Sequence, residues 1–263
     1  EKAANAFVRP YLDPAFQAQR ASGQRYTADT YVPPDVERFA VGDVRETRPA
    51  GDVMVVRYSV RAMESDPASA LVMGREKAPR LTVFHWNAAQ GRWQVVSHAN
   101  FNTPAGAVCS REQAVVTGGT PDVTGAADKA LGASIVDEFI GLLVSGDSAP
   151  ILDQQYQVQT ASGAGLTTFA ERKTPSKVEG MSYENALVTR NGNLLVFSAA
   201  FLTKTHTFMD VNQLRVGAVP HLLTFMKGGD GKWRMIGNAL FSPPNELPKG
   251  EQCGAPAKAA VAP

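Results

Sequence analysis

Four apolar-rich stretches in the second half of the chain predict β-strands. Residues 178–189, 193–203, 219–227 and 232–241 are enriched in β-branched and aromatic side chains. The three glycines of KGGDGK, at 227–232, separate the last two stretches and predict a hairpin turn. Together the four stretches predict an antiparallel sheet.

Ahead of these strands, apolar residues recur every three or four positions, which predicts helices. The segment AADKALGASIVDEFIGLLVSG, ended by Gly146, places four apolar residues on one face: Leu131, Ile135, Phe139 and Leu142. The next segment, SAPILDQQYQ, predicts a second helix with Ser148 as its cap and Pro150 in its first turn. Asp13 and Asp153 would then lie just inside helix starts, where a carboxylate compensates the N-terminal charge.

The first half of the chain repeats this pattern at an offset of 140 to 141 residues. YLDPAFQAQRASG at 11–23 returns as ILDQQYQVQTASG at 151–163, and GDVMVVRYSV from Gly51 matches GNLLVFSAAF from Gly192. PRLTVFHW likewise matches PHLLTFMK, and GRWQVVSHANFNTP matches GKWRMIGNALFSPP. Most identities are turn-forming or core residues. A period of this length predicts a duplicated domain rather than a solenoid.

Composition places the boundaries of the two copies. The first domain is expected at 1–104 and the second at 126–245, joined by a Gly-, Pro- and Thr-rich linker at 105–125. An Ala/Pro-rich tail at 246–263 is expected to be disordered. By the offset, Glu1 corresponds to Gly141. Most of the leading helix of the first copy is therefore expected upstream of Glu1.

Two stretches carry a resemblance to a known superfamily. RLTVFHWNAAQGRWQVVSHANF and HLLTFMKGGDGKWRMIGNALF each resemble the late hairpin of nuclear transport factor 2-like (NTF2-like) domains of the SnoaL-like and DUF4440 type, and GDSAPILDQQY resembles the second helix of that family. The resemblance implies an α+β fold of two tandem cone-shaped domains, each a curved antiparallel sheet with helices on the concave face. It implies functions as diverse as isomerases, hydrolases, ligand carriers and assembly modules.

The final hairpins allow the two faces of each sheet to be assigned. With Trp86 paired to Arg92 and Lys227 to Lys232, the more apolar face of each sheet is expected to line a cone pocket. The pocket candidates are Tyr58, His85, Trp93 and Ser97 in the first copy and Ala199, Met226, Trp233 and Gly237 in the second. The mixed faces are expected to pack together as an intrachain pseudo-dimer. Its interface candidates are Trp86, His98, Asn100, Arg234 and Asn238.

Two classes of function stay open at this stage. One is a non-catalytic protein that binds a small, largely apolar molecule in a cone pocket or acts in protein association. The other, implied by the resemblance, is a ketosteroid isomerase-like isomerase or a hydrolase in the first half, with His85 as base and Tyr58 donating to a developing oxyanion. The absence of Asp and Glu from the inward positions favours the first class. A third, purely structural reading fills both pockets with their own side chains, so cavity volume separates the three.

Composition narrows the partners and cofactors. Lys and Arg number 26 against 25 Asp and Glu, and a net charge of +1 argues against nucleic acid. The longest apolar run, 133–144, contains two acidic residues and is too short to span a membrane. No metal-ligand spacing or cofactor fingerprint occurs, so neither a metal nor a cofactor is expected.

The two cysteines leave the compartment open. Cys109 and Cys253 are either free thiols of a cytoplasmic protein or a disulfide joining the two tails of an exported one. The chain is expected to be monomeric if its two halves already pair with each other.

Overall fold

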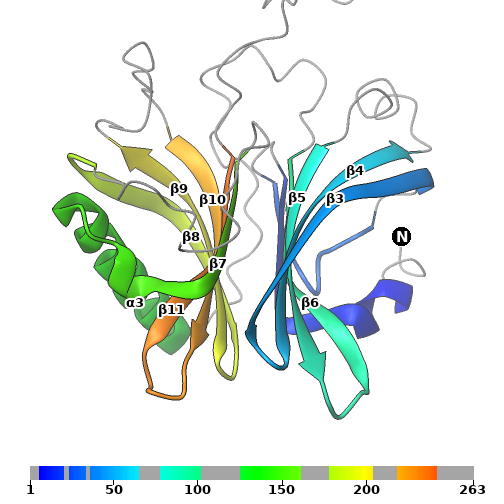
Figure 1. Ribbon diagram of the computed structural model, residues 1–263, viewed down its shortest axis with the longest axis horizontal. Coiled ribbons are helices and arrows are strands. Elements are labelled where there is room, and N and C mark those ends of the chain that lie inside the picture. The colour runs from blue at the N-terminus through cyan, green and yellow to red at the C-terminus, as the bar shows by residue number, and fades with distance from the viewer. Residues whose placement is uncertain are drawn as a thin grey trace, which may run out of the picture.

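The computed structural model describes residues 6–20, 24–33, 36–64, 78–101, 125–160, 178–203 and 218–241, which form two β-sheets lying face to face (Figure 1). The first sheet has the strand order β2-β1-β6-β5-β4-β3, and the second has the order β7-β11-β10-β9-β8. When β2 is set aside, the strands of each half follow the same relative order.

The strands of the first sheet are β1 (Leu12–Arg20), β2 (Arg25–Thr27), β3 (Val36–Ala50), β4 (Val53–Glu64), β5 (Ala78–Asn87) and β6 (Arg92–Asn100). Those of the second are β7 (Leu152–Thr160), β8 (Met181–Asn191), β9 (Leu194–Thr203), β10 (Ala218–Lys227) and β11 (Trp233–Leu240). The helical elements are α3 (Ala126–Ser145), a turn at 6–8, and the short 3-10 segments η1 (Arg9–Tyr11) and η3 (Ala149–Ile151).

The predicted strands of the second half and its first helix are confirmed. The four predicted strand segments are β8 to β11, within a few residues at each end. In the KGGDGK turn, the Gly228 N–H donates to the Lys232 carbonyl, and Gly231 has a φ of +80° that favours glycine. Helix α3 ends at Gly146, whose φ of +86° and N–H bond to the Leu142 carbonyl form a left-handed cap.

The second predicted helix is wrong, and so is the purely antiparallel character of the sheets. Residues 149–151 form one 3-10 turn, after which Leu152–Thr160 is a strand that runs parallel to β11, as β1 runs parallel to β6. Asp13 and Asp153 each accept a bond of 2.8 Å from the backbone N–H two residues later. This local turn competes with a helix, and the alternating QYQVQT that follows fits a strand.

A packed seam joins the two sheets. Apolar side chains from β4, β5 and β6 meet those from β9, β10 and β11 in one buried cluster, which includes Val55, Leu81, Val83, Ala99, Leu194, Val196, Leu222, Met226 and Ile236. At its edge the rings of Phe101 and Phe241 stack with centroids 4.5 Å apart. We call this contact the seam, and the opposite face of each sheet its outer face.

Two buried amides cross the seam in equivalent positions. From β1, the Gln17 Nε2 donates to the Leu187 carbonyl, the Thr189 hydroxyl and the Val196 carbonyl at 3.0–3.2 Å. From β7, the Gln157 Nε2 donates to the Arg45 carbonyl, the Thr47 hydroxyl and the Val55 carbonyl at 2.8–3.4 Å. We refer to Gln17 and Gln157 as the glutamine clamps. They match at the same register of the sequence repeat.

The outer face of the second sheet is covered by α3 (Figure 1). Ile135, Val136 and Phe139 of the helix share a buried cluster with side chains of β8, β9 and β10, among them Phe197 and Phe225. The helix approaches β8 closely at Gly132, where a Cβ atom would lie 2.9 Å from both γ-methyl groups of Val188.

Several predictions fall on residues outside the described ranges. These are the cysteine pair Cys109 and Cys253, all of the linker 105–125 except Gly125, and the tail 246–263. The domain boundaries stay predictions. In the part of the chain that the structure describes, no helix has the length and apolar character needed to cross a membrane.

Candidate functional site

A chain of three polar side chains crosses the outer face of the first sheet. Tyr58 on β4, Thr82 on β5 and His98 on β6 come from three neighbouring strands, and Thr82 lies directly opposite His98. The Tyr58 and Thr82 hydroxyl oxygens are 3.0 Å apart, and the Thr82 Oγ1 is 2.9 Å from the His98 Nδ1. The proton order along the chain depends on the tautomer of His98.

Burial keeps this chain uncharged. Desolvation, with smaller contributions from the charges of Arg80 and Arg20, lowers the pKa of His98 to about 3. Desolvation likewise raises the pKa of the Tyr58 phenol. Near neutral pH the imidazole is therefore unprotonated and the phenol is protonated. Such a chain can donate to or accept from a neutral hydroxyl or carbonyl group, but it offers no ionic partner.

A group of aromatic side chains lies on the same face as the Tyr58–Thr82–His98 chain. Tyr31 packs edge-on against Phe16 and Tyr26, with ring centroids 5.2 Å and 5.9 Å away. Burial raises the pKa of Tyr31. Phe16 belongs to β1, which pairs with β6, the strand of His98. The guanidinium of Arg20 covers the Tyr26 ring at 5.3 Å. The outer face of the first sheet thus combines aromatic surface, neutral hydrogen-bonding groups and the guanidinium groups of Arg20 and Arg80.

The second sheet has no such chain at the matching positions. Strand pairing aligns Tyr58 with Ala199, Thr82 with Leu223 and His98 with Asn238. Ala199 and Leu223 belong to the apolar cluster beneath α3, and both are fully buried. The outer face of the second sheet is therefore covered by α3 of the same polypeptide.

The expected assignment of the two faces is largely reversed. The pairing is Trp86 with Trp93 and Lys227 with Trp233, and each hairpin has a bulge, at Val83/Phe84 and at Thr224/Phe225. The most apolar face of the first sheet is buried in the seam instead of lining a pocket, because the contact between sheets excludes water most completely. The mixed face points outward.

The predicted pocket residues are therefore divided between the faces. Tyr58 and Trp93 lie on the outer face of the first sheet, where Trp93 packs edge-on against Trp86 at 5.6 Å. Ser97 lies in the seam and shares a 2.7 Å hydrogen bond with Thr224. In the second half, Ala199 and Trp233 pack in or against the cluster beneath α3, whereas Met226 and Gly237 lie in the seam.

The predicted interface residues do not form the contact between the sheets. His98 lies on the outer face of the first sheet and Asn238 on that of the second. Asn100 is the last residue of β6 and is paired with Arg80 on β5. Trp86 is partly exposed on the outer face of the first sheet. Arg234 is bonded to Asp230 within its own hairpin turn. The alternation around Leu81, Val83 and Ser97 was predicted correctly, but the register of each hairpin turn was wrong by one residue and the apolar set was given to the wrong side.

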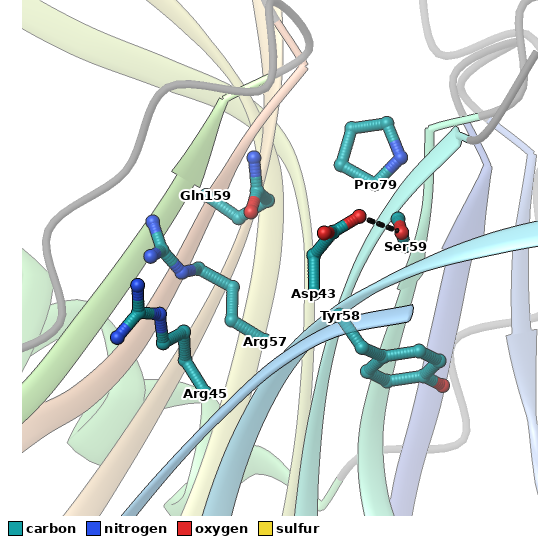
Figure 2. A pocket seen from close by; sticks show the side chains of 7 residues that line it. All are labelled: Asp43, Arg45, Arg57, Tyr58, Ser59, Pro79 and Gln159. Atoms are coloured by element: carbon teal, nitrogen blue, oxygen red, sulfur yellow. Dashed lines mark hydrogen bonds between the residues drawn. The ribbon is translucent and has the colours of Figure 1, made fainter. Parts of the chain in front are cut away.

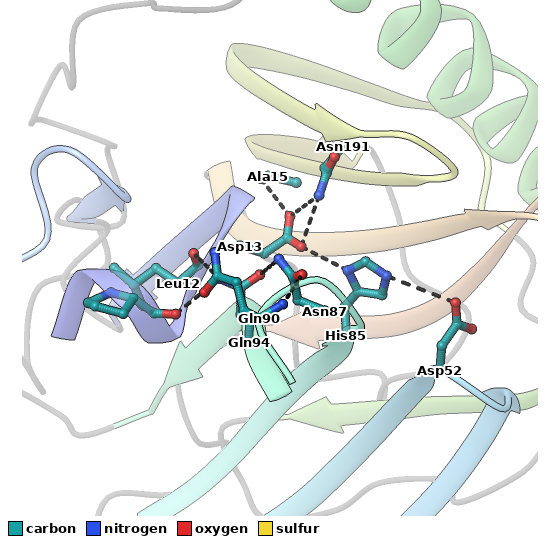
Figure 3. Close-up of polar contacts among 10 residues, drawn as sticks. Leu12, Asp13, Ala15, Asp52, His85, Asn87, Gln90, Gln94 and Asn191 are labelled. Carbon is teal, nitrogen blue, oxygen red and sulfur yellow. Dashed lines mark hydrogen bonds and ion pairs between the residues drawn. The ribbon is translucent and has the colours of Figure 1, made fainter. Parts of the chain in front are cut away.

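His85 takes part in a network at the end of the seam (Figure 3). Its Nδ1 is 2.9 Å from the Asp13 Oδ2, and its Nε2 lies 3.9 Å from Asp52. Asp13 is fully buried and also accepts bonds from the Ala15 N–H and the Asn191 amide. His85 thus joins β1, β5 and the β8–β9 turn. It does not share a site with Tyr58, whose hydroxyl is bonded on the other face.

Thr82, the central member of the polar chain, was missed from sequence. Its position follows from the alternation that places His98 and Thr82 on one face, so the signal was present once that face was known to point outward. Within the described residues, no group of three or more metal-ligating side chains lies together.

Comparisons with known proteins give similarity to solved structures alone. No protein-family model and no curated protein matches the sequence. An NTF2-like protein from Cytophaga hutchinsonii is 14% identical and covers 44% of this chain and 98% of its own, with a TM-score of 0.36. A candidate ketosteroid isomerase from Shewanella frigidimarina is 14% identical and covers 44% and 97%, with a TM-score of 0.33. The CaMKII hub of S. rosetta is 14% identical and covers 45% and 98%, with a TM-score of 0.36.

Proposed function

We propose that this protein binds a small, largely apolar molecule with one neutral hydrogen-bonding group on the outer face of the first sheet, without catalysis. The observation that carries the proposal is the Tyr58–Thr82–His98 chain, which stands where the second sheet has Ala199 and Leu223. Burying a neutral histidine and two hydroxyls costs desolvation that an apolar set avoids. The second sheet has the same strand order with apolar residues at two of these positions and Asn238 at the third, so the fold does not need the three-residue chain.

The second half then serves as a structural partner. We propose that the chain is two tandem NTF2-like domains, over 1–104 and 126–245, that pack as an intrachain pseudo-dimer. The common strand order and the equivalent glutamine clamps support a duplication. In this reading one outer face keeps its ligand site and the other is closed by α3.

The isomerase or hydrolase alternative has less support. It required His85 and Tyr58 at one cavity, and their hydrogen bonds lie on opposite faces of the sheet. His98 is the remaining imidazole near Tyr58. A pKa of about 3 makes it a weak general base near neutral pH.

A matched pair of probes tests the proposed site. 2-Naphthol and naphthalene differ by one hydroxyl, and both can be titrated by their own fluorescence. We expect saturable binding with about a fivefold preference for 2-naphthol, since one hydrogen bond contributes about 1 kcal/mol. The double variant Thr82→Leu/His98→Asn installs the residues of the second sheet and should remove the preference. Ser97→Ala, which alters only the seam, should keep it.

The proposal is contradicted if neither probe saturates, or if the preference survives in the double variant. Circular dichroism and urea unfolding of each variant show whether it is folded. Because the second sheet accommodates Leu223 and Asn238 at these positions, the double variant is expected to fold.

A role in protein association is the second candidate. Phe39 and Val41 are 72% and 52% exposed on β3, which is an edge strand of the first sheet. Exposed apolar residues on a free edge favour pairing with another chain. Light scattering after size exclusion separates the readings, because a self-paired chain should remain monomeric and an associating one should not. In the latter case Phe39→Asp/Val41→Asp should restore the monomer.

A further inference from the structure

We propose that a second site, at one end of the seam, binds a small organic anion through Arg45 and Arg57. A cavity of about 320 Å³ opens there between the sheets (Figure 2). Its lining residues are Asp43, Arg45, Arg57, Tyr58, Ser59, Pro79 and Gln159. The lining comes from β3, β4 and β5 of the first sheet and β7 of the second, while the Tyr58 ring points away from it (Figure 2).

The two guanidinium groups are held together by strand pairing. Arg45 on β3 lies directly opposite Arg57 on β4, and both side chains extend toward β7 (Figure 2). Like charges directly opposite each other on antiparallel strands are destabilising, and an anion bound between the two guanidinium groups would reduce this repulsion. Among the described lining residues Asp43 is the one carboxylate, and it accepts a 2.5 Å bond from the Ser59 hydroxyl. The described lining residues thus include two arginines and one aspartate, a formal charge of +1.

The opposite end of the seam shows that the fold does not require arginine here. Gln157 donates to the Arg45 carbonyl as Gln17 donates to the Leu187 carbonyl, so Arg45 and Leu187 occupy equivalent positions. Arg57 pairs with Arg45 and Ser198 pairs with Leu187, so Arg57 and Ser198 are equivalent as well. Ser198 donates a 2.6 Å bond to the Gln17 Oε1, whereas the buried Gln157 Oε1 has no partner among the described residues. Arg57 thus takes the place of a residue that would complete the clamp, at the expense of one hydrogen bond.

The arginine side chains have different surroundings at the two ends. At the opposite end, the guanidinium of Arg25 donates to the carbonyls of Asn185 and Ser198 at 2.5 Å and 3.2 Å. There the chain supplies a cation to backbone acceptors. At the Arg45/Arg57 end it supplies two cations around a cavity, so the complementary occupant is an anion.

The size and donors of the cavity specify the class of ligand. Guanidinium forks match the planar geometry of a carboxylate and also bind phosphate oxygens. A volume near 320 Å³ is at the lower end of small-molecule sites. The ligand we infer is a small organic molecule with a carboxylate or phosphate group. Because the cavity lies on the seam side of the sheet, this site is separate from the one on the outer face.

Thermal unfolding with two probes tests the inference. Malonate and inorganic phosphate are titrated at constant ionic strength maintained with NaCl, so that general screening stays fixed. We expect a saturable rise in Tm with at least one probe, and the probe that acts identifies carboxylate or phosphate as the recognised group. Arg45→Gln and Arg57→Ser should each weaken the apparent affinity at least tenfold.

Arg48→Gln is the matched control. Arg48 lies on the same strand, is half-exposed and is paired to Glu46, outside the cavity lining. It should leave the titration unchanged. In NaCl alone, Arg45→Gln should unfold at or above the wild-type Tm, because it removes one of two opposed charges. Absence of saturation with both probes, or an equal loss in Arg48→Gln, would overturn the inference. 2-Naphthol binding should be unaffected by any of these variants.

Discussion

The glutamine clamps provide a quantitative test of how the two sheets are held together. Gln17→Leu keeps the size of the side chain but removes the amide. The Gln17 Nε2 shares its two protons among three acceptors, and its Oε1 accepts from Ser198, so about three hydrogen bonds are lost. At about 1 kcal/mol for each bond, the free energy of unfolding should fall by about 3 kcal/mol.

Gln157→Leu is the internal comparison. It also removes two donated protons, worth about 2 kcal/mol, but the Gln157 Oε1 has no partner among the described residues, and its removal returns about 1 kcal/mol. The expected loss is therefore about 1 kcal/mol, which is about 2 kcal/mol less than for Gln17→Leu.

Urea unfolding followed by tryptophan fluorescence and circular dichroism measures both variants. The comparison is valid if the m-values agree with that of the wild type. Equal losses in the two variants, or a larger loss for Gln157→Leu, would refute the proposed difference between the clamps.

Three further predictions concern the helix, the polar chain and the His85 network. Gly132→Ala should lower the free energy of unfolding by about 1–3 kcal/mol through overpacking against β8, whereas exposed Gly141→Ala on the same helix should raise it by about 0.5–1 kcal/mol, both measured in urea. The pKa of His98 is about 3 in the folded state against an ordinary 6.5, so the unfolded state binds more protons between these two pH values. The free energy of unfolding should therefore be highest above pH 6.5 and should fall on acidification by up to ~1.4 kcal/mol per pH unit. That slope should be missing in His98→Asn, and an equal slope in both proteins would contradict it. Asp13→Ala should cost about 3–5 kcal/mol and Asp153→Ala about 1 kcal/mol in the same urea assay, because Asp13 also holds His85 and Asn191; similar costs would contradict the network.

Periodicity predicted the elements whose environment is simple. Helix α3 carries apolar residues at three-to-four spacing because it covers a sheet on one side, and the strands of the second half alternate or are continuously apolar. The strand β7 was taken for a helix because Ser148 and Pro150 imitate a helix start. The Asp153 turn and the polar alternation of Gln155, Gln157 and Gln159 were the signals against it.

The site was harder to predict because it depends on contacts between distant strands. The strand around His98 alternates correctly, but no local residue shows which face meets the other sheet. The bulge near Val83 further shifts the register by one residue. Arg45 and Arg57 become neighbours only through the irregular pairing of β3 with β4. Gln17 and Gln157 were visible as matches in the repeat, yet their partners lie more than 100 positions away in sequence.

The most direct test of the central claim is a crystal structure of the protein with 2-naphthol. We expect the ring beside Tyr31 on the outer face of the first sheet, with its hydroxyl within hydrogen-bond distance of the Tyr58–Thr82–His98 chain. Electron density for the probe beneath α3 or in the Arg45/Arg57 cavity, with none beside Thr82, would contradict it.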